Sequence, residues 1–361
     1  MQSLSVDEMV EPNNDSVSSV MVDRSRSKRS WLRCVMAAIA IAAMIGIFTL
    51  LRHAWTPPDC IMPVDTLPEN AAWLSVDWTS RVPDHMMVRQ LAVDAYARRL
   101  RYLLPFVSYV RPDGTFNPTY THAAEFVSVY RSFDKRSRLL AWIGIPVRNT
   151  QPFGMHGWVD LADSNERRKI ADFAAYLTHT IGFDGVHLDV EPVAGDNAHY
   201  LRLLEEVRIA IGTSHLLSVA GNHWQPMMLS RLPFVRAYGW SGEYLQAVAM
   251  RADQIVAMAY DSSAPWAALY RFWIREQVRG LNQALVNSPA QLIIGVSVSR
   301  EVTWTHNPTA ENLHNGLAGV CAALSRIGPM ERKVAGIAMY ASWEADVSDW
   351  MTWERWHGEM R

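Results

Sequence analysis

Short apolar runs alternate with longer amphipathic stretches from residue 71 almost to the C-terminus. The runs are rich in β-branched and aromatic residues, which is typical of strands, whereas the stretches between them repeat their apolar residues with helical spacing. In residues 164–180, for example, Ile170, Phe173 and Leu177 share one helical face and Ser164 offers an N-cap. Eight strands are predicted, at residues 73–78, 103–109, 139–147, 183–191, 216–220, 254–260, 292–298 and 335–340.

These strands begin about 30 to 45 residues apart, which leaves room for one strand, one helix and two loops each time. The pattern predicts an α/β protein with a (β/α)8 TIM barrel, in which functional residues lie where the strands end. A doubly wound open sheet is the alternative. It would need a glycine-rich phosphate loop after the first strand, and residues 76–85 (VDWTSRVPDH) do not provide one.

A different apolar pattern occupies residues 34–51, which carry no charge. As a helix this run would be roughly 27 Å long, enough to span a bilayer core. We expect an uncleaved transmembrane anchor here, because the run follows a long polar lead and no small-x-small cleavage site follows it. A cleaved signal peptide is the alternative.

The basic residues flanking this run predict its orientation. Five of them lie within residues 24–33, before the run, while Arg52 and His53 follow it. The positive-inside rule then places the N-terminus in the cytoplasm and the rest outside the cell membrane. The expected parts are a disordered cytoplasmic tail (1–33), the anchor in the lipid bilayer (34–51), a Pro-rich linker (52–70) and the barrel domain (71–361).

Composition narrows the classes of function. Lys and Arg total 34 against 36 for Asp and Glu, a formal net charge of −2, so no basic excess indicates a nucleic-acid partner. The 3 cysteines lack CxxC spacing, which argues against a disulfide scaffold or a structural zinc site. In an oxidising compartment Cys60 and Cys321 could pair, although two cysteines so far apart in sequence more often stay free.

The candidate chemistry lies on the predicted fourth strand. Its polar residues His187, Asp189 and Glu191 alternate with apolar ones, so the two sets point to opposite faces. In a barrel the polar set would point inward, with Glu191 at the C-terminal mouth. Buried ionisable groups are costly, which indicates either a functional site or an internally satisfied ion cluster.

This strand resembles the fourth strand of glycoside hydrolase family 18, the chitinases and endo-β-N-acetylglucosaminidases. The family motif is Asp-x-x-Asp-x-Asp-x-Glu. Asp184, Asp189 and Glu191 match three of its acids, and His187 stands where the family has the second Asp.

Three other segments resemble the family in the correct order. Residues 257–261 (AMAYD) resemble its sixth-strand Met-x-Tyr-Asp, and residues 292–299 resemble its seventh strand. Residues 336–346 resemble the eighth-strand segment that supplies an aromatic floor, for which Tyr340 and Trp343 are both candidates. The resemblance covers about residues 71–350.

The resemblance implies substrate-assisted glycoside hydrolysis, in which the substrate's own N-acetyl group is the nucleophile. Glu191 would protonate the leaving oxygen and Asp189 would orient the acetamido group. Tyr260 would steady the acetamido oxygen, with Asp261 nearby. No cofactor and no metal are expected, and the expected partner is a glycan that contains N-acetylhexosamine.

His187 departs from the family pattern. A protonated imidazole would lower the pKa of Asp189 and fix it as an anion, whereas a neutral one could donate a single hydrogen bond. A second possibility is that His187, Asp189 and Glu191 bind the metal of another barrel hydrolase.

Tryptophans near the predicted strand ends suit sugar rings, whose flat faces stack on indole. Trp78, Trp224, Trp266, Trp304 and Trp343 lie in such positions. The full set of predicted substrate-binding residues is Asp184, His187, Asp261, Tyr340, Trp343, Trp78 and Trp224.

The sequence therefore predicts a membrane-anchored, extracytoplasmic glycoside hydrolase that cleaves next to an N-acetylhexosamine. A catalytically silent carbohydrate-binding barrel is the rival from another class. The presence of Glu191 favours the enzyme, because relatives that lose activity usually lose this acid.

Overall fold

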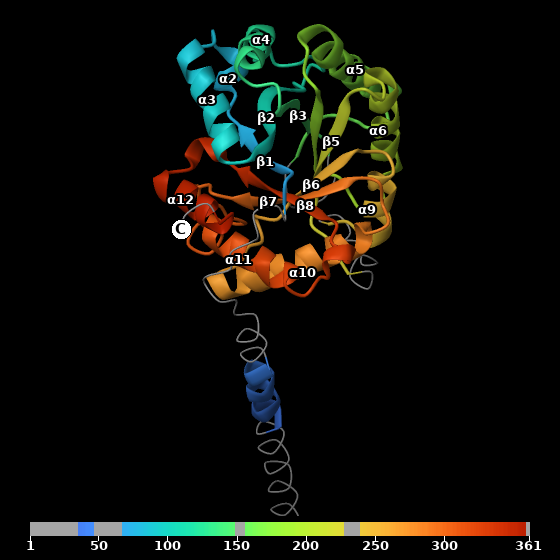
Figure 1. Cartoon of the computed structure of the whole chain (residues 1–361). Coiled ribbons are helices and arrows are strands. Elements are labelled where there is room, and N and C mark those ends of the chain that lie inside the picture. Colours follow the sequence, from blue (N-terminus) through green and yellow to red (C-terminus); the bar gives the residue numbers. More distant parts are fainter. Residues whose placement is uncertain (1–34, 47–66, 149–155, 227–238, 359–361) are drawn as a thin grey trace, which may run out of the picture. The chain divides into compact units, whose positions relative to one another are not determined.

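A computed structural model describes residues 35–46, 67–148, 156–226 and 239–358 of the chain (Figure 1). The chain divides into two compact units, Met1–His53 and Ala54–Arg361. The second unit contains all the strands described below, and it includes the candidate site.

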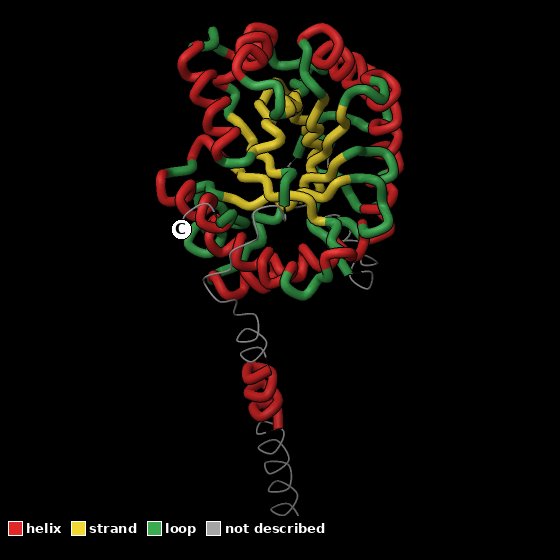
Figure 2. The backbone as a smooth tube through the Cα atoms, viewed as in Figure 1, coloured by secondary structure: helices red, strands yellow, loops and turns green. Residues whose placement is uncertain are grey.

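Eight parallel strands in the described residues form a closed barrel in which each strand pairs with the next and the last pairs with the first. This confirms the predicted TIM barrel. Figure 2 shows the strands inside a surrounding layer of helices. The strands are β1 (Asn70–Leu74), β2 (Leu100–Tyr109), β3 (Arg138–Pro146), β4 (Gly185–Glu191), β5 (Leu216–Gly221), β6 (Gln254–Met258), β7 (Gln291–Ser297) and β8 (Val334–Tyr340).

The helices follow the strands in the expected order, and several begin at an Asp or Asn whose side chain accepts hydrogen bonds from the first-turn N–H groups. The N-cap expected at Ser164 is instead Asp163, one residue earlier. The main helices are α3 (His85–Ala97), α4 (Ala123–Phe133), α5 (Ser164–Ala175), α6 (Ala198–Ile211), α9 (Gly242–Ala249), α10 (Ala267–Leu285), α11 (Leu313–Leu324) and α12 (Val347–Trp356). A π-helical turn, η1 (Tyr176–Ile181), extends α5, and a 3-10 turn, η3 (Ser342–Glu344), follows β8.

The first strand lies earlier than predicted. It spans Asn70–Leu74, and the segment predicted as its second half forms the short helix α2 (Asp77–Ser80). An acidic residue in the first turn, Asp77, favours a helix start there. The buried Thr79 hydroxyl then donates to the Phe106 carbonyl at 2.7 Å, which ties α2 to β2.

The alternation on β4 is confirmed. Val186, Leu188 and Val190 are buried in the large apolar core that includes helix residues such as Leu203 and Leu204. The inward positions of the barrel hold a second cluster, which contains Trp73, Tyr102, Leu104, Leu140, Trp142, Val256 and Ile293. The polar side chains of β4 therefore face an interior lined with aromatic and aliphatic groups.

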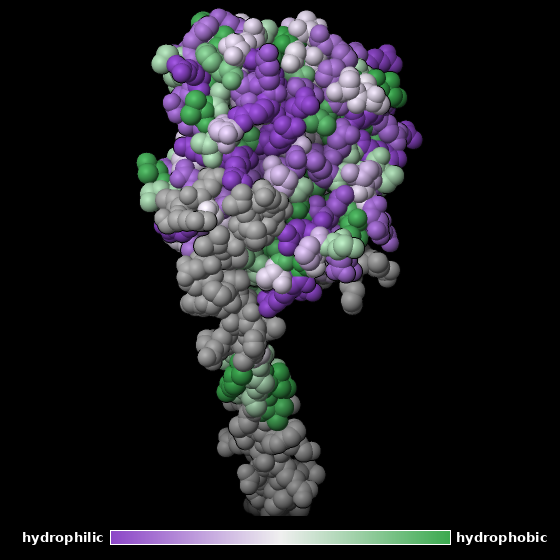
Figure 3. Space-filling view, viewed as in Figure 1, coloured by the Kyte–Doolittle hydropathy of each residue, from purple (hydrophilic) through white to green (hydrophobic). Residues whose placement is uncertain are grey.

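In the first unit, residues 35–46 form a helix whose side chains are mostly exposed, among them Met36, Ile39 and Ile45. Its visible surface is hydrophobic, whereas the visible face of the barrel unit is mainly hydrophilic (Figure 3). Within the described ranges, no helix has both the length and the apolarity needed to cross a membrane. The rest of the predicted anchor, Cys34 and residues 47–51, lies outside the described residues.

Candidate active site

The register of β4 places two carboxyl groups at the C-terminal end of the barrel. Asp189 lies beside Gly144 of β3, and Glu191, the last residue of β4, lies beside Pro146. Because they are two positions apart on one strand, both side chains point to the same face. The predicted pair of acids is thus brought together at the barrel mouth.

Asp189 is held by one hydrogen bond on one oxygen. Trp142 Nε1 donates to its Oδ2 at 3.0 Å. Its Oδ1 is buried and has no well-formed hydrogen bond with the described residues. Burial raises the pKa of Asp189 to about 6, although the side chains of Trp142 and Glu191 act to lower that pKa. The carboxylate therefore offers one buried oxygen to an N–H donor of a ligand.

Glu191 has the opposite electrostatic character. Burial raises its pKa to about 8, and the negative charges of Asp189 and Asp261 act in the same direction. Near pH 7 Glu191 consequently keeps its proton while Asp189 is ionised. A proton donor and an anion therefore lie side by side, as a general acid and its partner carboxylate require.

His187 is fully buried inside the barrel, and both of its ring nitrogens are engaged. Trp73 Nε1 donates to Nε2 at 3.1 Å, so Nε2 carries no proton. Nδ1 therefore donates to Ser218 Oγ at 2.9 Å, and Ser218 Oγ donates to Gln254 Oε1 at 2.8 Å. Burial lowers the pKa of His187 to about 3, so the ring is neutral.

These contacts correct the expectations for His187. The ring neither carries the charge that would fix Asp189 as an anion nor donates its N–H to Asp189. With no free nitrogen it also offers no ligand atom to a metal, which removes the basis of the metal-hydrolase alternative. Trp142, not residue 187, is the hydrogen-bond partner of Asp189.

The hydrogen bonds from His187 continue toward the other end of the barrel. Beyond Ser218 and Gln254, the amide Nε2 of Gln254 donates to Gln291 Oε1 at 3.4 Å. The Tyr102 hydroxyl donates to the same oxygen at 3.0 Å. This interior chain joins residues of β4, β5, β6, β7 and β2.

Aromatic rings surround the carboxyl pair. Tyr260 and Tyr340 stack with centroids 5.0 Å apart, and Trp73 packs edge-on against both. Trp343, with 46% of its surface exposed, stacks on Trp142 at 6.4 Å. Both candidates for the aromatic floor, Tyr340 and Trp343, thus contact this aromatic group. Burial raises the pKa of Tyr260 far above its ordinary value, so its hydroxyl is a neutral donor.

Asp261 follows Tyr260 directly and adopts a left-handed conformation with φ of 57°. Its Oδ1 lies 3.2 Å from Nδ1 of His306, which also contacts the buried Glu311. Among the described residues, Asp261, His306 and Glu311 form a group whose potential ligand atoms all lie within 4.8 Å of one another. This spacing would suit a metal ion. The contacts of His306, with two carboxylates at Nδ1 and the Ser299 carbonyl oxygen at Nε2, favour an ion-pair cluster.

Asp184 lies away from the other site residues, just before β4 at its N-terminal end. Its carboxylate is paired with Arg131 and Arg138 and accepts the Leu139 N–H at 2.7 Å. The substrate-binding role predicted for Asp184 is therefore not supported. Its contacts instead tie the start of β4 to β3 and α4.

Two of the predicted tryptophans are partly buried and pack against the apolar core. The Trp224 ring lies against Gly280 of α10, where even a Cβ atom would come within 2.1 Å of it. Its backbone exchanges two hydrogen bonds with the Gln277 side chain. Trp78 is on α2 and packs against Phe126 at 5.8 Å. These contacts do not bring Trp224 to the carboxyl pair, whereas Trp78 lines a cavity of about 350 Å³ together with Trp343.

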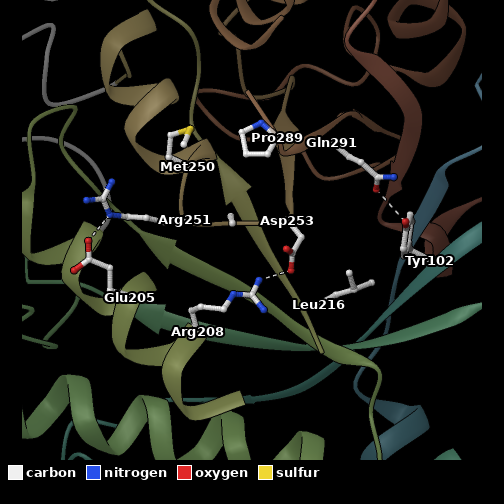
Figure 4. A pocket seen from close by; sticks show the side chains of 10 residues that line it. Tyr102, Glu205, Arg208, Leu216, Met250, Arg251, Asp253, Pro289 and Gln291 are labelled. Carbon is white, nitrogen blue, oxygen red and sulfur yellow. Dashed lines mark hydrogen bonds and ion pairs between the residues drawn. The ribbon is translucent and has the colours of Figure 1, made fainter. Parts of the chain in front are cut away.

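A cavity of about 730 Å³ lies at the N-terminal end of the strands, opposite Glu191. Figure 4 shows the side chains that line it. Leu216 and Gln291, the first residues of β5 and β7, line it together with Asp253. Its charged groups pair with one another, as in the contacts of Arg208 with Asp253 and of Arg251 with Glu205. This cavity belongs to the face of a TIM barrel that serves stability.

Four residues that contribute to the site were not predicted from the sequence: Trp73, Trp142, His306 and Glu311. Trp142 lies two residues after Leu140 on β3, and both side chains point into the barrel. Strand alternation could therefore have predicted its inward position. His306 and Glu311 lie in the long loop between β7 and α11, where no local pattern marks them.

A closed parallel barrel with an acid and a carboxylate at its C-terminal mouth, ringed by aromatic side chains, has the architecture of a glycoside hydrolase. The family model described as glycosyl hydrolases family 18 matches residues 115–359. The chain belongs to this family and is a glycoside hydrolase, as the resemblance predicted.

Solved structures share the fold at low sequence identity. The spore cortex-lytic enzyme SleL of Bacillus cereus has a TM-score of 0.54 and 16% identity, over 82% of this chain and 75% of that one. A class V chitinase from Pseudomonas fluorescens Pf-5 has a TM-score of 0.53 and 13% identity, over 80% and 99%. A chitinase of Cycas revoluta, in complex with (GlcNAc)3, has 0.54 and 13% over 80% and 99%. No curated protein sequence matches the chain.

The Trp142 indole is predicted to position Asp189. Trp142→Phe keeps an aromatic ring but removes the donor to Oδ2, and a hydrogen bond to a charged group of this kind corresponds to a loss of about 10-fold to 100-fold in kcat/KM. Because this bond lowers the pKa of Asp189, its loss should also move the acid limb of the pH–rate profile to higher pH. Trp158→Phe is the control, since that indole donates to the Val110 carbonyl away from the carboxyl pair. Equal activity of the two variants would contradict the assignment.

Proposed function

We propose that this family 18 enzyme hydrolyses a glycosidic bond next to an N-acetylhexosamine by substrate-assisted, retaining catalysis. The observation that carries the proposal is the pair of carboxyl groups on β4. Burial keeps Glu191 protonated near neutral pH, while Asp189 beside it is ionised. Such a pair suits a reaction in which the protein supplies an acid and an orienting anion but no nucleophile.

Glu191 and Asp189 have different roles in the proposed reaction. The proton of Glu191 passes to the leaving glycosidic oxygen as the bond from that oxygen to the anomeric carbon breaks. The acetamido carbonyl oxygen of the substrate forms the new bond to the anomeric carbon, giving a cyclic intermediate. Asp189 Oδ1, buried and without a well-formed hydrogen bond, accepts the acetamido N–H and stabilises the positive charge that develops there. Water then opens the ring, with Glu191 taking up its proton.

The substrate class is supported by the aromatic groups and by a structural neighbour. Tyr340 and the half-exposed Trp343 present rings on which a sugar face can stack. The chitinase of Cycas revoluta was solved in complex with (GlcNAc)3. We therefore propose a glycan that contains N-acetylglucosamine as the substrate. With a net charge of −2, nucleic acid is not proposed as a partner.

We also propose that residues 34–51 anchor the chain in a cell membrane, with the N-terminus in the cytoplasm and the barrel outside. The uncharged run and the basic residues before it support this orientation. Cys321, on α11, is disulfide-bonded rather than free as expected, and disulfides persist in oxidising compartments. Cys60, the partner considered from the sequence, lies outside the described residues.

Glu191→Gln is the test of the mechanism. The substitution keeps the shape of the side chain but removes the proton donor, so kcat on (GlcNAc)4 should fall by about 10²–10⁴-fold while the oligosaccharide still binds. Glu125→Gln, at an exposed position of α4, is the matched control and should retain activity. Undiminished turnover by the Glu191 variant would exclude the mechanism. A wild-type protein that binds the oligosaccharide without cleaving any N-acetylglucosamine glycan would favour the carbohydrate-binding alternative.

The pH dependence follows from the two carboxyl groups. Activity requires Asp189 ionised and Glu191 protonated, so kcat/KM should fall below about pH 6, where Asp189 gains a proton, and above about pH 8, where Glu191 loses one. The two apparent values belong to the pair as a whole. His187→Gln should leave both limbs in place, because His187 stays neutral over this range. A limb that disappears in that variant would show that His187 titrates during turnover.

Topology can be measured separately from activity. A reporter enzyme fused after Arg361 should be active only when that end lies outside the cytoplasm, since the basic residues precede the apolar run. Replacing the five basic residues within 24–33 by Gln should reduce or invert that signal. Reporter activity confined to the cytoplasm in the parent chain would overturn the proposed localisation.

A further inference from the structure

Two loops at the barrel mouth meet in a cluster of three ionisable side chains. Asp261 lies after β6, whereas His306 and Glu311 lie between β7 and α11. His306 Nδ1 is 3.2 Å from Asp261 Oδ1 and 3.3 Å from Glu311 Oε2. His306 is 4% exposed and Glu311 is completely buried, while half of the Asp261 side chain reaches solvent. We refer to these three residues as the Asp261 cluster.

The second nitrogen of His306 determines the charge of the ring. Nε2 lies 3.3 Å from the carbonyl oxygen of Ser299, which can only accept a hydrogen bond, so Nε2 carries a proton. Nδ1 faces two carboxylates, which also only accept when ionised. A lone pair on Nδ1 would be repelled from both sides, so this nitrogen carries a proton as well. His306 is therefore an imidazolium, and its two carboxylate neighbours raise its pKa to about 10 against the opposing effect of burial.

Glu311 links this cation to the backbone beside Asp261. Its Oε1 accepts the Ser262 N–H at 3.0 Å and the Ser262 hydroxyl at 2.7 Å. Asp261 and Ser263 both have φ of 57°, which non-glycine residues rarely adopt. The Ser263 N–H donates to the Thr305 carbonyl at 2.8 Å. The unusual conformation of residues 261–263 is thus held by contacts with the loop after β7.

Three further titratable groups among the described residues face the cluster without adding positive charge to it. His223 experiences the charges of Asp261 and Glu311, but burial lowers its pKa and keeps it neutral. Tyr270, from α10, also faces both carboxylates, and burial raises its pKa far above neutrality. Glu191 carries its proton near pH 7 and feels the charge of Asp261. The imidazolium of His306 therefore balances the carboxylates of its own cluster.

We propose that His306 is a positioning residue of the active site, which holds the Asp261 carboxylate at the barrel mouth through an imidazolium that the buried Glu311 counterbalances. The inference rests on the proposed function in one respect, because it takes Asp261 to face the glycan. The spacing of the cluster would also accept a metal ion, and the experiment distinguishes a proton from a metal.

Histidine-labelled full-length protein allows the charge of His306 to be read by NMR. The His306 signals, assigned by their loss in His306→Gln, should show protons on both nitrogens from pH 6 to pH 9. His179→Gln, at an exposed position, is the control for assignment. A His306 ring that titrates near its ordinary pKa of about 6.5 would overturn the proposal. Loss of activity and altered His306 signals on addition of a chelator would assign the cluster to a metal instead.

Charge balance can be tested by rescue. His306→Gln leaves the buried Glu311 anion without its cation, and the Tm should fall by roughly 5–10 °C. Adding Glu311→Gln removes that anion, while the carbonyl oxygen of the introduced amide can still accept from Ser262, so most of the loss should be recovered. If the Tm losses of the two single substitutions simply add in the double variant, the two residues only fill space. His179→Gln should leave the Tm unchanged.

The kinetics of the double variant, His306→Gln with Glu311→Gln, test the positioning role separately from the effect on stability. With stability restored but Asp261 no longer held, KM should rise about 10-fold while kcat changes by less than about 3-fold, and Asp261→Asn should give a similar increase. An unchanged KM in the double variant would overturn the positioning role. If the parent protein cleaves no N-acetylglucosamine glycan, the proposed function fails, and the NMR and Tm measurements alone decide whether the cluster is as proposed.

Discussion

Two partly buried carboxyl groups lie close together on one face of β4 at the mouth of the barrel, and the cost of ionising both together shapes the rest of the site. In a medium of low dielectric constant, one negative charge on Asp189 disfavours a second on Glu191. The pair therefore divides into an anion and an acid through burial and mutual repulsion. The Trp142 indole N–H stabilises the charge on Asp189, while no described residue donates a comparable hydrogen bond to Glu191.

The fold and the acid pair could be predicted because both depend on local periodicity. Alternation with a period of two residues placed His187, Asp189 and Glu191 on one face of β4, and the spacing of the strands indicated the barrel. The boundary of β1 could not be predicted in the same way. Apolar and aromatic residues recur past Leu74, at Val76 and Trp78, which favoured a longer strand over a helix starting at the acidic Asp77. The contact of Thr79 with β2 holds this helix in place.

The errors in the candidate site arise from contacts between distant parts of the chain. The neutrality of His187 depends on Trp73, which is 114 positions away, and on Ser218 of β5. Trp224 follows β5 as a sugar-binding residue might, but Gly280 of α10 leaves space for its ring within the protein. Asp184 matches the family motif, yet Arg131 and Arg138 engage it at the other end of the strand. None of these partners is marked by a pattern near the residue itself.

The interior chain of hydrogen bonds that begins at Trp73 has a consequence for proton traffic. Its links run from an indole N–H to an imidazole, a hydroxyl and an amide, and it ends on Gln291 Oε1, which also receives the Tyr102 hydroxyl. The hydrogen bonds thus run toward Gln291 Oε1 from both sides, from Trp73 at one end and from Tyr102 at the other. Indole and amide N–H groups do not release protons in the physiological range, so this arrangement cannot conduct a proton along the barrel axis. These hydrogen bonds therefore hold the barrel interior together without linking the acid pair at the mouth to the opposite face of the barrel.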